Sequence, residues 1–312
     1  MKAIGPPELV LCSVRVEKMA GLVEEADKAV ELTFGDVEDM LKSVLGSIHG
    51  TDSEEREYTS LAELWKEQLA VPGAQEQALH ESGKDLNWYT HAYAYWEDPA
   101  NCPVTDDGVL GGYGALTPAD CKESSAFLLK VKAMRPELQL SVAADLGAGC
   151  GRVSKNFLLK HFQSVHLFEQ SPRLVAGAPA YIGAPDNARV TCSVQVLQDF
   201  KPAPNTYDVI WIQWVIGHLH DLDYVAFFRQ CAAGLKPGGV IVLKDNCTEE
   251  SAFSVDLDDS SVARHPEYHR LLMHLAGLNI LLEQVQTGFP EDLCPVHMFA
   301  LTLAPTRPAG AP

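Results

Sequence analysis

The stretch that decides the fold spans residues 144–152 and reads Ala-Asp-Leu-Gly-Ala-Gly-Cys-Gly-Arg. An apolar run at 141–146 leads into it and predicts a β-strand, and a helical pattern at 153–162 follows it. Glycines between a strand and a helix permit positive φ angles and let a nucleotide approach the backbone. Glu169 stands 22 residues after Gly147, where a carboxylate can accept hydrogen bonds from both ribose hydroxyls. The segment therefore predicts a nucleotide-cofactor site.

The spacing of the glycines distinguishes two cofactor classes. The dinucleotide fingerprint is G-x-G-x-x-G, and its third glycine falls where this chain has Arg152. Here Gly147, Gly149 and Gly151 form G-x-G-x-G, with Asp145 two positions before the first glycine. This form resembles motif I of the class I S-adenosylmethionine-dependent methyltransferases. The resemblance implies S-adenosylmethionine as the cofactor, and the fork of the Arg152 guanidinium suits the methionine carboxylate.

Short apolar or β-branched runs separated by helical stretches predict a mostly parallel sheet with crossover helices. They lie at residues 141–146, 164–168, 190–194, 208–211, 239–243, 278–284 and 296–303. The last two have no obvious helix between them, which predicts an antiparallel pair. We therefore expect an α/β fold: a doubly wound, Rossmann-like sheet of seven strands, mostly parallel with an antiparallel C-terminal end, plus a helical N-terminal extension. Lys-Pro-Gly-Gly at 236–239 resembles a turn of the same superfamily.

Three parts of the chain are expected. They are an acidic helical extension at 1–88, an S-adenosylmethionine-dependent methyltransferase domain at 89–303 and a loose Pro- and Ala-rich tail at 304–312. Residues 74–86 read as a linker within the extension. The extension suits a lid, a partner-binding appendage or a lineage-specific insertion, and we expect the domain to fold without it.

Two helices are predicted within the extension. Apolar residues recur at helical spacing over 37–48, with Asp36 as the expected N-cap and Gly50 as the expected stop. Ser60 followed by Glu63 resembles a capping box, which predicts the start of the second helix.

Charge and composition narrow the partners. The chain has 24 Lys and Arg against 42 Asp and Glu, a net charge of −18, and no basic block offsets it. We therefore expect no direct nucleic-acid partner and favour a cationic one. No run of about 18 apolar residues is present, so no membrane span is expected. Eight cysteines without C-x-x-C or paired Cys/His spacing predict reduced thiols and no metal site.

Two further regions narrow the resemblance. The first is Tyr95-Trp96, followed by Gly-Val-Leu-Gly-Gly-Tyr-Gly at 108–114. The second includes Trp-Ile-Gln-Trp-Val-Ile-Gly-His-Leu at 211–219, followed by Lys-Asp-Asn at 244–246 and Asp-Leu-Asp-Asp-Ser-Ser-Val at 256–262. Together they resemble the protein α-amino N-terminal methyltransferases, which methylate exposed amino termini of the Xaa-Pro-Lys/Arg type. The resemblance covers about residues 90–303 and implies basic protein N-termini as substrates, with a cytoplasmic or nuclear location, or both.

The resemblance also implies roles for particular residues. For the cofactor they are Gly147, Gly149, Arg152, Glu169, Leu197, Gln198 and Gln213. For the peptide they are Trp96, Leu110, Gly111, Trp214, Asn246, Asp256 and His297. Asp259 and His218 match the pair proposed to handle the proton. The chain departs from the family at two of these positions: Glu169 stands where Asp is usual, and His297 where Tyr is typical.

The chemistry gives these residue types independent reasons. An α-amine has a pKa of about 7.7–8.0, so a large share is protonated at neutral pH and cannot attack a methyl group. The carboxylate of Asp259 and the imidazole of His218 can accept that proton. Trp96 and Trp214 offer flat faces for a proline ring or a methylated ammonium. Asp256, with Asp258 beside it, suits Lys or Arg at the third peptide position.

Plainer interpretations remain open at this level. Trp214 lies in an apolar run typical of a core, His218 alone is compatible with a structural histidine, and the aspartates at 256–259 with a solvated turn. A small-molecule methyltransferase would share the cofactor loop and be indifferent to proline. A non-catalytic binding protein would retain only the fold. The sequence decides neither the number of methyl groups added nor the oligomeric state, for which a monomer is expected.

Overall fold

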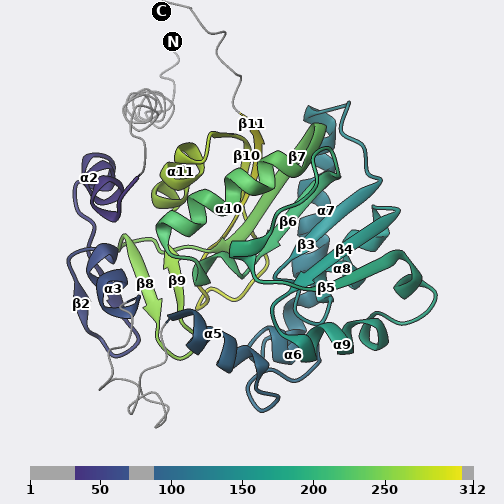
Figure 1. The fold of residues 1–312 in the computed structure, drawn as a ribbon, viewed down its shortest axis with the longest axis horizontal. Helices are drawn as coiled ribbons and strands as arrows, with labels where there is room; N and C mark the ends of the chain where they lie inside the picture. Colours follow the sequence, from purple (N-terminus) through teal and green to yellow (C-terminus); the bar gives the residue numbers. More distant parts are fainter. Residues whose placement is uncertain (1–31, 70–87, 304–312) are drawn as a thin grey trace, which may run out of the picture.

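The structure is a computed structural model that describes residues 32–69 and 88–303 (Figure 1). The predicted linker at 74–86 and the predicted tail at 304–312 lie outside the described residues. Across the two described ranges, no helix is long and apolar enough to span a bilayer.

Within the described residues, the main sheet has seven strands in the order β10-β11-β7-β6-β3-β4-β5. Their bounds are β3 Val142–Leu146, β4 Ser164–Glu169, β5 Val190–Val194, β6 Tyr207–Gln213, β7 Leu235–Asn246, β10 Leu278–Val285 and β11 Val296–Leu303. β11 pairs antiparallel with both β7 and β10, and the other neighbours are parallel. The predicted fold class and all seven predicted strands are confirmed.

Helices cover both faces of this sheet, which explains why its central strand is buried throughout. All seven residues of β6 are buried. Ile210 and Ile212 pack in a core cluster with α10 (Asp221–Gly234) and α11 (Pro266–Leu275). Val209 and Trp211 pack on the other side. There they meet α7 (Thr117–Met134), α8 (Arg152–Asn156) and α9 (Pro172–Ile182). The helix expected at 153–162 is shorter than predicted, because a separate 3-10 turn, Leu158–Lys160, follows α8.

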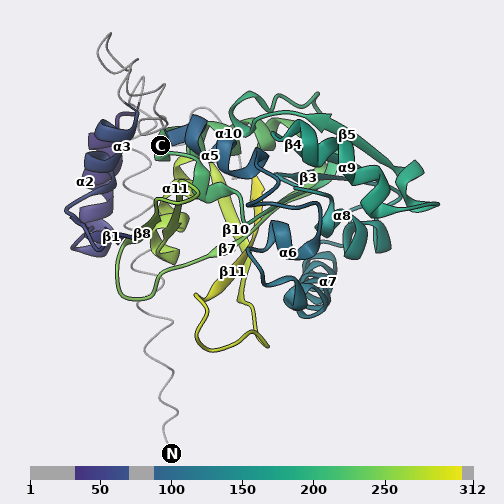
Figure 2. The ribbon, with the colours of Figure 1, turned by 90° about the horizontal axis from the view of Figure 1, so that it is seen from below.

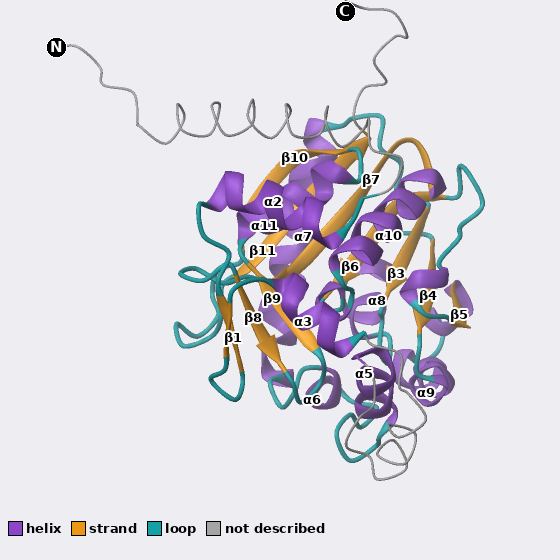
Figure 3. Ribbon diagram, turned by 60° about the vertical axis from the view of Figure 1, so that its left-hand side comes forward, coloured by secondary structure: helices purple, strands orange, loops and turns teal. Residues whose placement is uncertain are grey.

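A second, smaller sheet brings distant parts of the chain together (Figure 3). Its order is β2 (Glu57–Tyr58), β1 (Gly50–Asp52), β8 (Phe253–Asp256) and β9 (Ser261–Arg264). β1 runs parallel to β8, which in turn pairs antiparallel with β9. None of these strands was predicted, because two to four residues are too few to show an alternating pattern. The extension is therefore not purely helical.

The two predicted helices of the extension exist with different caps. The N-cap of α2 (Phe34–Leu45) is Thr33, whose hydroxyl accepts the Asp36 N–H at 3.2 Å, while Asp36 accepts the Thr33 N–H at 2.7 Å. Asp36 is thus the third residue of a capping box, and the prediction that it was the cap is wrong. The last helical residue of α2 is Leu45, and its C-cap is Gly46, with φ 76°, which comes before the predicted stop at Gly50. At α3 (Leu61–Gln68), Ser60 makes no side-chain cap, and Glu63 accepts from Thr59 instead.

The extension shares its core with the rest of the molecule. Val37, Leu41, Leu64 and Trp65 are buried in the same cluster as α10 and α11. Figures 1 and 2 show α2 and α3 at the end of the molecule opposite β5. Removing residues 32–69 would therefore expose part of the common core. Burial of such side chains contributes about 1.5–3 kcal/mol each, so the loss would be substantial. The expectation that the domain folds without the extension does not fit this packing.

Candidate active site

The predicted glycine loop lies at the carboxyl end of β3, where the strand order reverses between β3 and β6. Gly147 has φ 66°, and a Cβ there would come within 2.3 Å of Val215 Cγ2. Gly149 has φ 56°, and its Cβ would lie 2.8 Å from Val109 Cγ1. The loop therefore requires glycine at both positions, and it leaves backbone open to a ligand.

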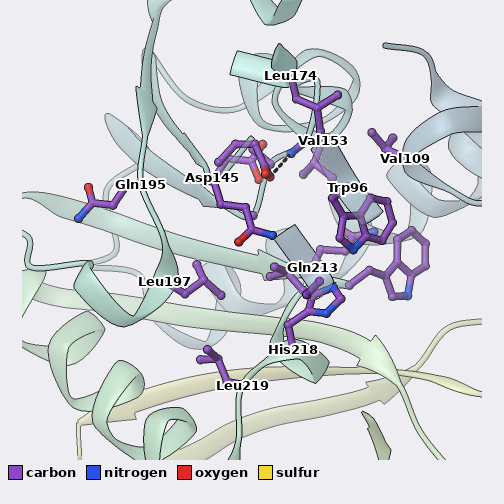
Figure 4. Close-up of a pocket in the computed structure, with 18 of the residues that line it drawn as sticks. Trp96, Val109, Asp145, Val153, Leu174, Gln195, Leu197, Gln213, His218 and Leu219 are labelled. Atoms are coloured by element: carbon purple, nitrogen blue, oxygen red, sulfur yellow. Dashed lines mark hydrogen bonds between the residues drawn. The ribbon is translucent and has the colours of Figure 1, made fainter. Parts of the chain in front are cut away.

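All seven residues predicted to bind the cofactor line one pocket beside this loop (Figure 4). Leu197 and Gln198 come from the 3-10 turn after β5, and Gln213 ends β6. Val153 and Leu174 add apolar surface. A cradle of glycine backbone with a carboxylate at the next strand end fits S-adenosylmethionine, although the role of each residue stays a prediction.

Glu169 ends β4 and is turned toward the loop. Its Oε2 accepts the Gly149 N–H at 3.0 Å, and its Oε1 accepts the Ser171 N–H at 2.9 Å. Burial raises the pKa of this carboxyl, and these backbone donors oppose the rise. A carboxylate oxygen accepts more than one hydrogen bond, so both oxygens retain capacity for a ribose diol. The longer side chain of Glu is thus compatible with the ribose contact that the resemblance implies, and that role stays a prediction.

A buried ionic cluster underlies the pocket, and the sequence analysis missed its centre, Asp120. Arg152 Nη1 contacts Asp120 Oδ2 at 2.6 Å, Lys244 Nζ contacts Oδ1 at 2.5 Å, and Gln213 Nε2 donates to Oδ1 at 2.9 Å. Burial alone would raise the pKa of Asp120, but the two cations outweigh it and hold the pKa below its usual value. Arg152 therefore carries its own counter-ion, and its other N–H groups remain for a ligand carboxylate.

A second, wider pocket adjoins the first. It is lined by six of the seven predicted peptide residues and by the predicted proton-handling pair: Trp96, Leu110, Gly111, Trp214, Asn246, Asp256, His218 and Asp259. Trp96, Trp214 and His218 line both pockets, so the two are contiguous. In Figure 4 the rings of Trp96 and His218 lie side by side, with centroids 6.0 Å apart. Residues that lie far apart in the chain, between Trp96 and Asp259, thus line one connected space.

His297 is the exception. It lies in β11, and among the described residues it lines neither pocket. Its Nδ1 is 3.1 Å from Glu283 Oε1 and its ring stacks on Phe299. The preceding residue, Val296, lines the wider pocket instead, because successive strand residues face opposite sides of a sheet. The predicted substrate contact of His297 does not fit this placement.

His218 lines both pockets, and Asp259 lines the wider one. His218 Nδ1 is 2.8 Å from the carbonyl oxygen of Ser260, so Nδ1 donates and the neutral ring keeps its lone pair on Nε2. Burial raises the pKa of Asp259, and the nearby His218 opposes the rise. Asp259 Oδ1 is buried without a hydrogen-bond partner in the described part of the chain. This arrangement can take up a proton at either group.

Trp214 has an uncommon backbone conformation. Its φ of 52° lies in the left-handed region, which costs a bulky residue on the order of 1–3 kcal/mol. Trp214 Nε1 donates to Asn246 Oδ1 at 3.1 Å, and the ring stacks with Phe289 at 6.4 Å. The Asn246 oxygen is thereby oriented by Trp214, and its amide N–H₂ can donate to a peptide carbonyl.

Asp245 is a site residue that the sequence analysis did not single out. It is 9% exposed and lines the wider pocket. Burial raises its pKa to about 7. Its Oδ1 accepts the Asn246 N–H at 2.8 Å, whereas Oδ2 has no partner within the described ranges. Its only sequence signal was its place beside Asn246.

The glycine cradle at the switch point of this sheet, with an antiparallel β11, defines a class I S-adenosylmethionine-dependent methyltransferase. A model of the family described as AdoMet dependent proline di-methyltransferase matches residues 84–302, and the chain belongs to that family. The chain is 39% identical over 268 residues to "Alpha N-terminal protein methyltransferase 1" of Dictyostelium discoideum, a match covering 83% of this chain and 92% of the relative. It is 40% identical to "N-terminal Xaa-Pro-Lys N-methyltransferase 1" of Rattus norvegicus, covering 70% and 96%.

A solved structure agrees with the fold. A Leishmania major S-adenosylmethionine-dependent methyltransferase superposes with a TM-score of 0.72 at 33% identity, covering 82% of this chain and 96% of its own. The family model begins at residue 84 of this chain. The match to the Dictyostelium relative covers 83% of the chain, which is more than the part after residue 84 contains. Part of the segment before residue 84 is therefore shared with that relative.

Proposed function

We propose that this enzyme methylates the α-amino group of proteins whose exposed N-terminus reads Xaa-Pro-Lys or Xaa-Pro-Arg. The observation that carries the proposal is the junction of the two pockets. The first has the lining of an S-adenosylmethionine site, and the second is a wider pocket with an acidic wall at Asp256, Asp258 and Asp259. His218, at the boundary, lies where an amine must meet a methyl group.

The chain's own residues manage the proton in this reaction. S-adenosylmethionine, when bound, would supply a methyl group on its sulfonium, which the amine nitrogen can take as the methyl–sulfur bond breaks and the neutral thioether leaves. The α-amine arrives largely protonated, and Asp259 with the Nε2 of His218 accepts its proton before attack. Since the pKa of Asp259 is raised toward that of the amine, the transfer is less uphill than to an ordinary aspartate.

The wider pocket suits the first three residues of the peptide. The ring of Trp214 presents a flat face for proline, and Asn246 beside it can donate to a backbone carbonyl. Asp256 is exposed at the end of β8, where a third-position Lys or Arg can reach it. A free amine, a proline and a basic residue thus each have a counterpart.

Mass spectrometry tests the proposal. A Ser-Pro-Lys peptide is incubated with the enzyme and S-adenosylmethionine, alongside an N-acetylated peptide and one with Pro replaced by Ala. We expect steps of about 14 Da, one CH₂ each, on the free Pro peptide alone, and their number gives the degree of methylation. Equal methylation of the Ala peptide, or none of any peptide with cofactor binding confirmed, would instead favour a small-molecule substrate.

A further inference from the structure

Residues 32–69 pair with β8 of the β8–β9 hairpin and are linked to β9 through Asp221. The acidic turn of this hairpin, residues 256–260, carries Asp256 and Asp259. We propose that this segment is a positioning element of the peptide site, which holds the acidic turn in register with His218. The inference rests on the proposed function, since it concerns how the peptide is recognised. Its consequence is that weakening these contacts impairs peptide binding while S-adenosylmethionine binding stays unchanged.

The first set of contacts holds β8. Gly50, Thr51 and Asp52 of β1 pair with Phe253, Ser254 and Val255. The approach is close, because a Cβ on Gly50 would lie 2.4 Å from the Phe253 carbonyl oxygen. The last contact lies in the acidic turn itself, where Ser53 Oγ accepts the Leu257 N–H at 3.2 Å.

The turn that presents Ser53 is itself braced. Asp52, 7% exposed, accepts the N–H groups of Glu54 at 3.0 Å and Arg56 at 2.9 Å through Oδ1. Its Oδ2 accepts the Tyr58 hydroxyl at 2.9 Å. Three hydrogen bonds to one buried carboxylate leave the Ser53 hydroxyl in a defined position beneath the acidic turn.

The second set of contacts holds β9 and the backbone of His218. Trp65 Nε1 donates to Asp221 Oδ2 at 3.0 Å. Arg264, the last residue of β9, donates through Nη2 to Asp221 Oδ1 at 3.0 Å and to the carbonyl of Leu219 at 2.7 Å. The Trp65 ring also packs edge-on against Trp88, whose Nε1 donates to the His218 carbonyl at 2.7 Å.

The hairpin needs such support. In the second sheet, β8 pairs with β9 on one side and with β1 on the other. Without β1, β8 would keep β9 as its one strand partner in this sheet among the described residues and would lose the hydrogen bonds along its other edge. The carboxylates of the acidic turn lie at the end of this hairpin, so their distance from His218 depends on how firmly β8 is held.

The test uses Ser53→Ala in the full chain, which removes the hydroxyl that accepts from Leu257. Ser47→Ala is the matched control, because the Ser47 hydroxyl is exposed in the same segment and contacts only His49 among the described residues. For Ser53→Ala we expect the KM of the Ser-Pro-Lys peptide to rise roughly three- to tenfold, the size of one lost hydrogen bond. The preference of this variant for the Ser-Pro-Lys peptide over a Ser-Pro-norleucine peptide should be smaller than that of the wild type. The Kd of S-adenosylmethionine by calorimetry should stay within about twofold, and Ser47→Ala should match the wild type.

An unchanged peptide KM and Lys preference in Ser53→Ala, or an equal loss of cofactor affinity, would overturn the inference. Amide hydrogen exchange separates it from the proposed function, because it needs no substrate. If the wild type methylates none of the peptides, the proposed function fails. Faster exchange at Leu257 in Ser53→Ala but not in Ser47→Ala still supports the positioning role, and equal exchange in all three proteins refutes it.

Discussion

Asp259 and His218 are the two residues to which we assign the proton of the substrate amine. The Asp259 carboxyl is buried with its pKa raised, and His218 is held by Ser260 so that its Nε2 can accept a proton. The Asp259 carboxyl must be deprotonated to serve as a base, so activity should rise with pH through the range in which Asp259 and the substrate amine lose protons.

Asp259→Asn keeps the shape of the side chain and removes its basicity. We expect kcat to fall by about 10²–10⁴, and His218→Ala to have an effect of similar order, because each removes a proton acceptor. Steady-state methylation of the Ser-Pro-Lys peptide measures kcat, and calorimetry measures cofactor affinity. A matching loss of S-adenosylmethionine affinity would contradict the assigned role.

Arg152→Ala tests the predicted pairing with the methionine carboxylate. We expect the Kd of S-adenosylmethionine to rise at least roughly tenfold, because a charge-assisted pair is lost from a buried position. The matched control is Lys155→Ala in the same helix, since Lys155 lies over the Tyr181 ring and does not line the pocket. Unchanged affinity of the Arg152 variant would refute the pairing.

The protonation of Asp245 affects the stability of the folded protein. Its pKa is raised from 3.8 to about 7 by burial, so the folded protein binds this proton more tightly than the unfolded chain. Its contribution to stability is full below about pH 4 and is lost as the pH rises through 7. Asp245→Asn stays neutral, so at pH 8 it should raise the free energy of unfolding by an amount on the order of a few kcal/mol, and raise Tm with it, with little effect at pH 4–5. Thermal unfolding of the wild type and the variant at pH 8 and at pH 4–5 tests this prediction. An equal rise in Tm at both pH values would contradict the raised pKa.

At the scale of elements, whether a strand could be predicted from the sequence depended on its length and on how far along the chain its pairing partner lies. The seven strands of the main sheet were predictable, because each is an apolar run next to a glycine-rich turn or helical pattern. The four strands of the second sheet were not, because β1 and β8 are about 200 residues apart and gain their stability only by pairing. The cap of α2 was misplaced by three residues because Thr33 and Asp36 are both good capping residues.

Trp65→Phe tests the role of α3 as an integral part of the fold. The variant keeps an aromatic ring but removes the N–H that Asp221 accepts in the buried Arg264 cluster. We expect the free energy of unfolding to fall by about 1–3 kcal/mol, measured by urea denaturation with one cooperative transition. A separate early transition assigned to residues 32–69 would show that the extension unfolds independently.

At the scale of the whole molecule, the net charge of −18 favours the approach of the basic peptide that we propose as substrate. Long-range attraction between them is screened by salt, with a Debye length of about 8 Å at physiological ionic strength. We expect the KM of the Ser-Pro-Lys peptide to rise severalfold between low and high salt. The cofactor KM, governed by buried contacts, should change much less. Equal salt dependence of both would argue against electrostatic attraction of the peptide.

The sequence by itself determined the fold class and the cofactor loop, because these depend on local patterns such as glycines at a strand end. Contiguous motifs such as 211–219 carried the family resemblance, which named most of the residues that line the two pockets. Only the tertiary structure decided that Asp120 is the counter-ion of Arg152, that His297 faces away from the pocket and that Asp245 is buried beside it. It also placed β1 beside β8 and the Ser53 hydroxyl against the Leu257 N–H of the acidic turn. These facts depend on which residues distant in the chain become neighbours and lose water, and no local pattern encodes that.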